Sequence, residues 1–318
     1  MKWIVVFIFF FFLTNWIGGR ILLSGLNQFY GLTQHSDILL IGHSHLMLAV
    51  NKEQLENGSE MKVSKYTREG VNVFDRYYMI KQFLDSKYSD SLKIVFYGVD
   101  QFTFVQSGLS ENSHKLFYPF IGNPIIAQFI KANESNRIDF YKYKFFPLTR
   151  YSDVLINASL RGWRRDFANY KSGTMDVEAY RQHIANNDTQ FDRDLQIDAE
   201  LLARFEESIN KITERGIKVI LINTPIIDIL NDSDPENYQA VMQIYTDFVA
   251  ANELVEYWDL NPDFSNNYSL FYDPIHLNPK GQEMVTEELI ERLKRLTLQL
   301  SILSKRSTYD KYRNSSIQ

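Results

Sequence analysis

Short apolar runs that alternate with segments of helical periodicity constrain the fold of this chain more than any other feature. Five such runs cover residues 37–42, 61–66, 92–99, 217–222 and 255–258. A short apolar run bounded by turn residues is typical of a strand buried on both faces of a parallel sheet. Strands that alternate with helices predict a doubly wound α/β domain with a parallel sheet of about five strands.

The segments between these runs predict the helices that connect parallel strands. One helix is expected to precede the fourth run, because Leu201, Phe205 and Ile209 share a helical face, and to end at Gly216. The spacing of apolar residues predicts further helices over 75–84, 236–251 and 281–296. The polar tail 301–318 is expected to fray.

Residues 101–195 are too many for a simple crossover and are interpreted as an insertion. The segment is rich in aromatic residues interleaved with lysine and arginine. Aromatic residues at helical spacing are usually core, so helices that cover the sheet are expected. A surface that stacks sugars or holds an anionic polymer is the alternative.

Composition excludes several classes of function. The chain has 318 residues, a formal net charge of -5 and no cysteine. Disulfides, thiolate metal sites and cysteine nucleophiles are therefore absent. The mild negative charge, with no dominant basic run, argues against nucleic acid as a partner.

The amino terminus predicts a membrane segment. Residues 3–13 are wholly apolar, and residues 14–23 prolong the run weakly. We interpret residues 1–23 as a signal anchor, since no small-x-small cleavage site follows and Trp16 suits an interface; a cleaved signal peptide is the alternative. Either way, the domain 24–318 is expected outside the cytoplasmic membrane.

Two motifs at opposite ends of the chain could form a catalytic triad. Ser44 follows the first strand in ILLIGHSH, at the carboxyl end where ligands bind in open parallel sheets. Asp273 and His276 stand three residues apart in FYDPIHL, just before the last helix. This spacing lets a carboxylate hold one imidazole nitrogen while the other faces the serine. The alternative for Ser44 is a helix cap.

His43 and His45 suggest a second kind of site. Together with Asp273 or His276 they could ligate zinc. However, we expect no metal and no cofactor.

The two motifs resemble those of the SGNH (GDSL-like) hydrolases. Gly42-His43-Ser44 resembles their first block, usually G-D-S, and Asp273-Pro274-Ile275-His276 matches their D-x-x-H block. The resemblance covers about 37–100 and 196–296. It implies Ser44 as nucleophile, His276 as base and Asp273 as its orienting acid. It also implies a flavodoxin-like strand order of 2-1-3-4-5, with the insertion over the carboxyl edge near Ser44.

The resemblance implies an oxyanion hole made by the backbone of Ser44, by Gly70 and by a residue of the third block. That block falls at Gly98-Val99-Asp100, where Asp100 replaces the usual asparagine. An ionised carboxylate cannot donate a hydrogen bond, so Asp100 is expected to be buried and protonated, with Asn72 or Gln101 as substitutes.

With its anchor, the chain looks most like extracytoplasmic SGNH-like proteins of envelope polymer modification, such as the D-alanine transfer protein of lipoteichoic acid synthesis. The resemblance implies a serine esterase or acyltransferase that acts on O-acyl esters of an envelope polysaccharide or teichoic-acid-like polymer. It also implies a membrane-bound O-acyltransferase as partner. The alternative is an inactive binding or scaffold protein for that polysaccharide or acyltransferase.

Overall fold

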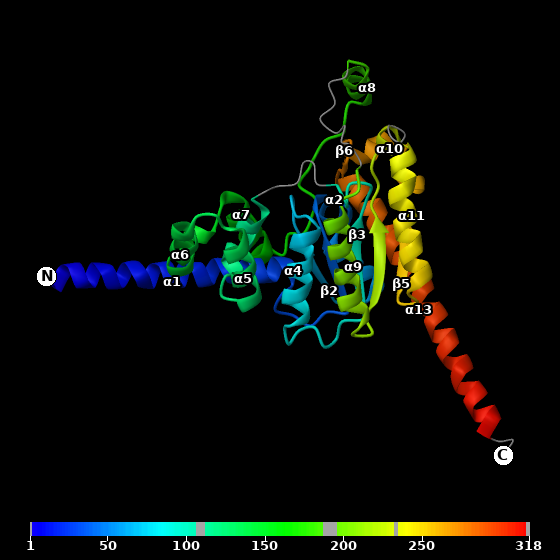
Figure 1. Cartoon of the computed structure of the whole chain (residues 1–318), viewed down its shortest axis with the longest axis horizontal. Helices are drawn as coiled ribbons and strands as arrows, with labels where there is room; N and C mark the ends of the chain where they lie inside the picture. The colour runs from blue at the N-terminus through cyan, green and yellow to red at the C-terminus, as the bar shows by residue number, and fades with distance from the viewer. Residues whose placement is uncertain (1, 106–111, 187–195, 232–234, 316–318) are drawn as a thin grey trace.

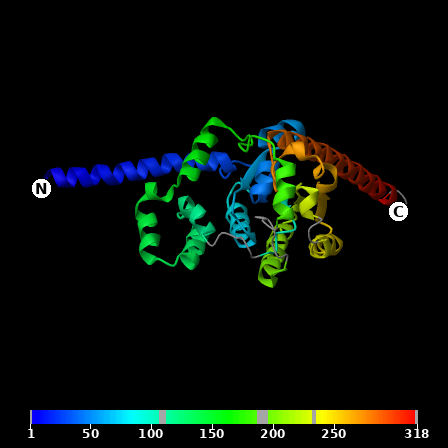
Figure 2. The same cartoon turned by 90° about the horizontal axis from the view of Figure 1, so that it is seen from above.

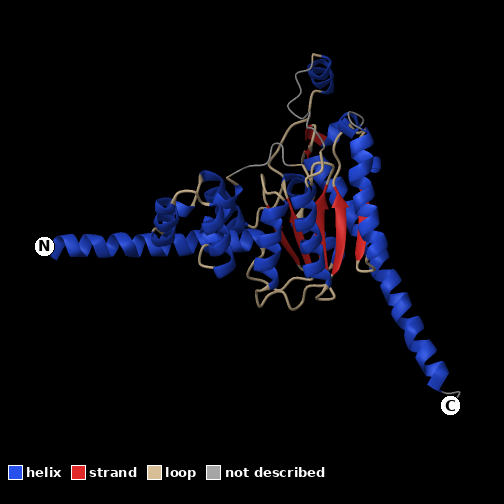
Figure 3. Ribbon diagram, in the orientation of Figure 1, coloured by secondary structure: helices blue, strands red, loops and turns tan. Residues whose placement is uncertain are grey.

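A five-stranded parallel sheet forms the centre of the molecule in the computed structural model (Figures 1 and 3). The structure describes residues 2–105, 112–186, 196–231 and 235–315. The strands are β1 (Ile38–Gly42), β2 (Val63–Thr67), β3 (Ile94–Val99), β4 (Lys218–Asn223) and β5 (Val255–Asp259). All neighbours pair in parallel, and the order is β2-β1-β3-β4-β5. This confirms the predicted parallel sheet and its strand order.

Alternate residues of the strands supply two separate cores, one on each face of the sheet. Leu39 and Ile41 of β1 belong to one core, and Ile38 and Leu40 belong to the other. Because successive side chains of a strand point to opposite faces, a strand between two helical layers must be apolar throughout. The continuous apolar run of β1 is therefore a direct consequence of its central place.

Helices cover both faces. The first core contains residues of α4 (Val73–Leu84), α9 (Ala199–Thr213) and α11 (Pro235–Ala251). The second contains residues of α2 (Ser44–Ala49), α3 (Lys52–Ser59) and α13 (Pro279–Ser315). The predicted helices therefore exist, with one difference: α13 continues to Ser315, where a frayed tail was expected from residue 301.

The short helix α2 lies very close to the sheet because two glycines leave room for it. A Cβ added at Gly42 of β1 or at Gly98 of β3 would lie 2.9 Å from Cβ of Leu46. Leu46 is fully buried against both positions. Gly42 is thus more than the end of a strand, since its missing side chain sets the distance between α2 and the sheet.

Most of the insertion forms a helical group beside the amino-terminal helix (Figure 2). The group contains η1 (Ser113–Phe120), α5 (Pro124–Asn133), α6 (Arg137–Phe145), η2 (Pro147–Arg150) and α7 (Asp153–Arg164). The helix α8 (Val177–Ala185) lies apart from it (Figure 1). The helix α1 (Lys2–Tyr30) is continuous, so the expected boundary at residue 23 falls inside it. α7 crosses α1 where Gly162 meets Gly25, while Phe129 of α5 stacks on Tyr78 of α4.

Among the described residues of the insertion, the segment 167–175 reaches the carboxyl ends of the strands. Asn169 donates hydrogen bonds to the carbonyl oxygens of Leu48 and Leu277, and Met175 N–H donates to Phe271. Residues 106–111 and 187–195 of the insertion lie outside the described residues. The expectation of helices that cover the sheet is correct for α5, whose Ile126 and Phe129 join the core, and wrong for α6, which has no buried residue.

The remaining elements lie between β4 and α13. They are α10 (Asp228–Asn231), α12 (Asn261–Phe264), η3 (Tyr268–Leu270) and a two-stranded antiparallel pair of β6 (Phe271–Asp273) and β7 (His276–Leu277). Tyr268 connects two of them, because its hydroxyl donates to Asp228 Oδ1 over 2.8 Å. The β6-β7 pair places the second sequence motif beside α2.

Gly98→Ala should destabilise the domain. The added Cβ would meet Leu46, and overpacking of a tight core typically costs about 1–3 kcal/mol. Gly122→Ala is the matched control, because a Cβ there meets nothing within 4 Å. Denaturant unfolding of both variants measures the difference. An equal free energy of unfolding for Gly98→Ala and Gly122→Ala would show that α2 can move away from the sheet freely.

Candidate active site

Ser44 is the first residue of α2, directly after the turn that ends β1. His43 is the N-cap residue: its backbone is extended, and its Nδ1 accepts a hydrogen bond of 3.1 Å from the backbone N–H of His45. An acceptor side chain at this position satisfies one of the free N–H groups of a first helical turn. The helix is therefore capped by the histidine before Ser44, which leaves the Ser44 hydroxyl available.

Asp273 and His276 flank the tight turn between β6 and β7. Oδ1 of Asp273 accepts hydrogen bonds from the backbone N–H groups of Ile275 and His276, at 3.0 and 2.9 Å. The carboxylate thus stabilises the turn in which it lies and holds the imidazole of His276 close to it. The predicted turn across Pro274 is confirmed.

The three side chains meet across 232 residues of sequence. Nε2 of His276 lies 2.9 Å from Ser44 Oγ, and its Nδ1 lies 2.8 Å from Asp273 Oδ2. The prediction that Ser44 and His276 come within hydrogen-bond distance is confirmed. In this arrangement Nδ1–H donates to the carboxylate, and Nε2 can accept the proton of the serine hydroxyl.

Asp273 is held in its charged form. Burial alone would raise its pKa, but the hydrogen bond to His276 and two backbone N–H donors lower the pKa below its usual value. An ionised Asp273 fixes the tautomer of His276 that leaves Nε2 without a proton. This tautomer is the one a general base needs.

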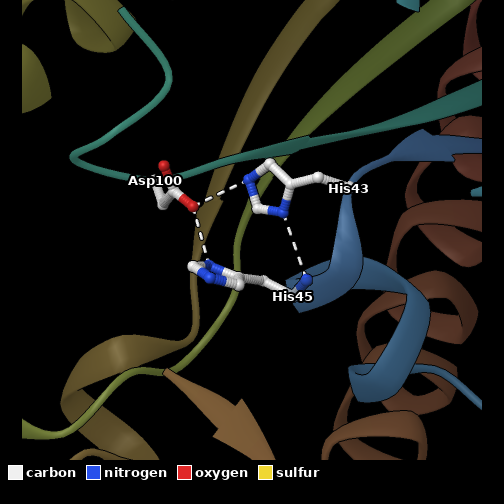
Figure 4. Close-up of side chains that lie close together, drawn as sticks. All are labelled: His43, His45 and Asp100. Carbon is white, nitrogen blue, oxygen red and sulfur yellow. Dashed lines mark hydrogen bonds and ion pairs between the residues drawn. The ribbon is translucent and has the colours of Figure 1, made fainter. Parts of the chain in front are cut away.

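A second histidine-carboxylate cluster joins Asp100 to His43 and His45, the residues before and after Ser44 in the chain (Figure 4). Oδ2 of Asp100, directly after β3, lies 2.8 Å from His43 Nε2 and 2.7 Å from His45 Nδ1, although no ring N–H points squarely at it. Oδ1 accepts hydrogen bonds from the N–H of Phe102 and the hydroxyl of Thr103. One carboxylate therefore contacts both residues that flank Ser44 in the chain.

The expectation of a protonated Asp100 that donates a hydrogen bond is wrong. Asp100 is buried, which alone would raise its pKa, but His43 and His45 hold the pKa well below the usual value. All the close groups around its oxygens carry N–H or O–H donors, so the site favours a charged acceptor. Asp100 thus cannot replace the family's amide as an oxyanion donor.

The two substitutes for that donor have different positions. Asn72 is the N-cap of α4 and forms a capping box with Asp75, so its Oδ1 is occupied and only its NH₂ group could donate to another atom. Gln101 is buried, and its Oε1, which can only accept, has no hydrogen-bond partner among the described residues.

The same cluster is the candidate metal centre among the described residues. One ligand atom each of His43, His45 and Asp100 lies within 4.8 Å of the others. Asp273 and His276 do not join them, because they hold one another and Ser44. The N···O distances of 2.7 and 2.8 Å are shorter than the roughly 3.3 Å between ligands of tetrahedral zinc, so a bound ion would need the three groups to separate.

Buried polar groups also hold the far end of α2. Nζ of Lys65 donates to the carbonyl oxygens of Met47 and Val50, at 2.7 and 2.5 Å. A cation at the carboxyl end of a helix complements its dipole. Burial lowers the pKa of Lys65 to about 7. The sequence does not indicate this contact of Lys65, since a lysine in a strand belongs to no motif. For the Asp100 cluster, the repeated histidine in GHSH is the one signal in the sequence.

A cavity of about 460 Å³ adjoins α2 one turn beyond Ser44. Met47 and Leu48 line it, and so does Gly70, which has a φ of 70° in the turn after β2. Ser44 and His276 do not line it. Its other walls combine apolar side chains with the cations Lys65, Arg68, Arg161 and Lys171.

Comparisons with known proteins add little. No family model matches the chain, and no curated protein matches it. One similar solved structure is titled "The structure of a putative platelet activating factor from Streptococcus pneumonia". It shares 12% sequence identity with a TM-score of 0.37, over 92% of this chain and 99% of that one.

The His43 cluster should make the stability of the domain depend on pH. Burial lowers the pKa of His43 from 6.5 to about 4, although Asp100 opposes this shift. A depressed pKa contributes stability that is complete above about 6.5 and is lost as pH falls towards about 4. Between pH 7 and 5 the free energy of unfolding should drop by about 2 kcal/mol from this group.

Denaturant unfolding of the full chain in detergent at both pH values tests this prediction. His43→Asn should remove the part of the drop that His43 contributes, while burial also lowers the pKa of His45, which should keep its own part; His35→Gln, at an exposed histidine, should keep the whole drop. A drop that is the same in wild type and His43→Asn would assign the pH dependence to other groups.

Proposed function

We propose that this chain is an extracytoplasmic serine esterase or acyltransferase of the SGNH type that acts on O-acyl esters. The observation that carries the proposal is the continuous chain of hydrogen bonds from Asp273 through His276 to Ser44. A structural serine does not need a basic imidazole nitrogen at 2.9 Å whose other nitrogen is held by a charged carboxylate.

The reaction follows from these contacts. Ser44 Oγ attacks the acyl carbonyl carbon while His276 Nε2 takes its proton, and Asp273 stabilises the imidazolium that results. When the tetrahedral intermediate collapses, His276 returns the proton to the leaving alcohol and an acyl-Ser44 ester remains. Water or a sugar or polyol hydroxyl then attacks this ester, with His276 again as base.

The oxyanion would be stabilised by the backbone N–H groups of Ser44 and Gly70. Gly70 follows β2 on a turn tied to β1, because Arg68 N–H donates to Gly42 carbonyl oxygen over 3.1 Å. Charged Asp100 does not supply the third donor, so the hole would have two backbone donors. Removal of one such donor typically costs about 10²–10³-fold in rate.

The surroundings of α2 support an acylated, anionic polymer as substrate. The cavity beside Met47 combines apolar walls with the cations Arg68, Arg161 and Lys171 and one acid, Glu69, while the Nζ of Lys65 is bound to two carbonyl oxygens. Apolar walls suit an acyl group, and the cations suit phosphate or carboxylate groups of a teichoic-acid-like polymer or polysaccharide. A membrane-bound O-acyltransferase as the acyl donor or acceptor completes the proposal.

The location of the reaction follows from α1. This helix is long and apolar enough to cross a membrane, and it is mostly exposed. We assign it as a signal anchor that holds the domain at the outer face of the cytoplasmic membrane. Cleavage of the helix would instead release the same domain as a secreted enzyme.

An inactive scaffold is the competing function. It is favoured by Asp100, which stands where SGNH hydrolases usually have asparagine. A fold that binds the polymer or the acyltransferase without turnover would need no reactive serine. The reactivity of Ser44 therefore separates the two proposals.

Ser44 should react covalently with a fluorophosphonate probe. Ser44→Ala should abolish labelling of the full chain, because only a serine with a working base reacts readily. Ser172→Ala, at an exposed serine in the segment 167–175, should label like wild type. An unlabelled wild-type protein that is folded would favour the scaffold.

Asp100→Asn should lower ester turnover, by roughly 10²-fold if it displaces the turn that carries Ser44. The amide would place its NH₂ group either against both histidines, in place of Oδ2, or against the N–H of Phe102, in place of Oδ1, so the contacts of one oxygen would be lost. Asp90→Asn, at an exposed aspartate, serves as control. A faster Asp100→Asn enzyme would mean instead that the amide completes the oxyanion hole.

A further inference from the structure

The insertion contacts α1 at a depth that a spanning α1 would place inside the bilayer. Phe146 stacks on Phe12 at 5.7 Å between ring centroids and also contacts Phe11. A Cβ at Gly18 would lie 2.7 Å from Leu148, and the hydroxyl of Tyr151 donates to Gly19 carbonyl oxygen. These contacts fix the segment around η2 against a defined stretch of α1.

The rise per residue of an α-helix gives the depth of these contacts within the bilayer. The hydrocarbon core needs about 20 helical residues at 1.5 Å each. The strongly apolar stretch 3–13 covers only about 16 Å, so a span that begins at Trp3 must continue to about residue 22. Phe11 and Phe12 then lie near the middle of the bilayer, and Gly18 and Gly19 lie in its outer half.

The side of α1 that faces the insertion is shaped for close packing. Asn15, Gly19 and Gly25 are the buried positions of this stretch, and Ser159 Oγ donates to Leu22 carbonyl oxygen. Small residues at helix contacts let two backbones approach within a membrane, where no hydrophobic effect drives association. The insertion is therefore fixed to the anchor itself and would share its depth.

The helix α6 exposes the side chains that such a position requires. Ile138, Tyr141 and Phe145 are 77%, 53% and 60% exposed, at helical spacing on one side of α6. The adjoining Lys142 and Lys144 can reach outward to lipid phosphates. Arg150, which would otherwise bring a bare charge near lipid, donates to the carbonyl oxygens of Tyr143 and Lys144.

We infer that the segment 137–150, formed by α6 and η2, enters the outer leaflet of the membrane beside α1 and forms a second, non-spanning membrane contact. The partner is the lipid bilayer, with apolar side chains in the acyl region and lysines at the headgroups. Two contacts rather than one would restrict rotation of the domain about its anchor. This inference rests on the proposed placement of α1 as a membrane span.

The absence of cysteine makes the test direct. Phe145→Cys, Ile8→Cys and Glu178→Cys each place one nitroxide label on an exposed site of the full chain. The proteins are reconstituted in phosphatidylcholine and phosphatidylglycerol vesicles. Relaxation of the label by oxygen, which concentrates in lipid, is compared with relaxation by a water-soluble nickel chelate.

The label at Phe145 should respond like the one at Ile8, more to oxygen than to nickel, whereas Glu178 in α8 should respond in the opposite way. A lipid-like Ile8 with a water-like Phe145 would overturn the inference and leave the anchor intact. It would also favour a protein partner for α6. A water-like Ile8 would overturn both the inference and the proposed membrane location.

Discussion

The close packing of α2 on the ends of β1 and β3 is the constraint on which the site depends. Leu46 packs directly over Gly42 and Gly98, so α2 cannot rise from the sheet without opening the core, and it cannot approach further. Ser44 stands at the start of this helix. Polar contacts then fix the far end, through Lys65 on Met47 and through Asn169 and Gln282 on the carbonyl oxygen of Leu48. Packing therefore positions Ser44 independently of its hydrogen bond to His276.

Two carboxylates contact residues at and beside Ser44 in the chain, and their surroundings differ. Asp273 accepts hydrogen bonds from its own turn and contacts His276. Asp100 contacts His43 and His45, the neighbours of Ser44 in the chain, through one oxygen, Oδ2. An amide at position 100 would put its NH₂ group either against both histidines or against the N–H of Phe102. The two histidines of GHSH and Asp100 are thus parts of one contact.

The helix α1 and the insertion pack together and lead towards α2. α7 crosses α1 at Gly25 and Gly162, and residues of α7 line the cavity that Met47 of α2 also lines. The segment 167–175 then continues from α7 to the carboxyl ends of the strands. One helix, α7, therefore contacts both α1 and the cavity beside α2.

The sequence by itself determined the buried strands, the apolar amino-terminal helix and the two motifs that contain Ser44, Asp273 and His276. Each of these has a local signature, because buried strands must be apolar on both faces and D-P-I-H must turn sharply. The tertiary structure decided the state of Asp100, the position of α2, the contacts of Lys65 and the contact of η2 with α1. These depend on groups that are distant in sequence, such as His43 and Asp100, or Phe12 and Phe146. The protonation of a buried carboxyl is set by which donors surround it, and only the folded chain brings those donors together.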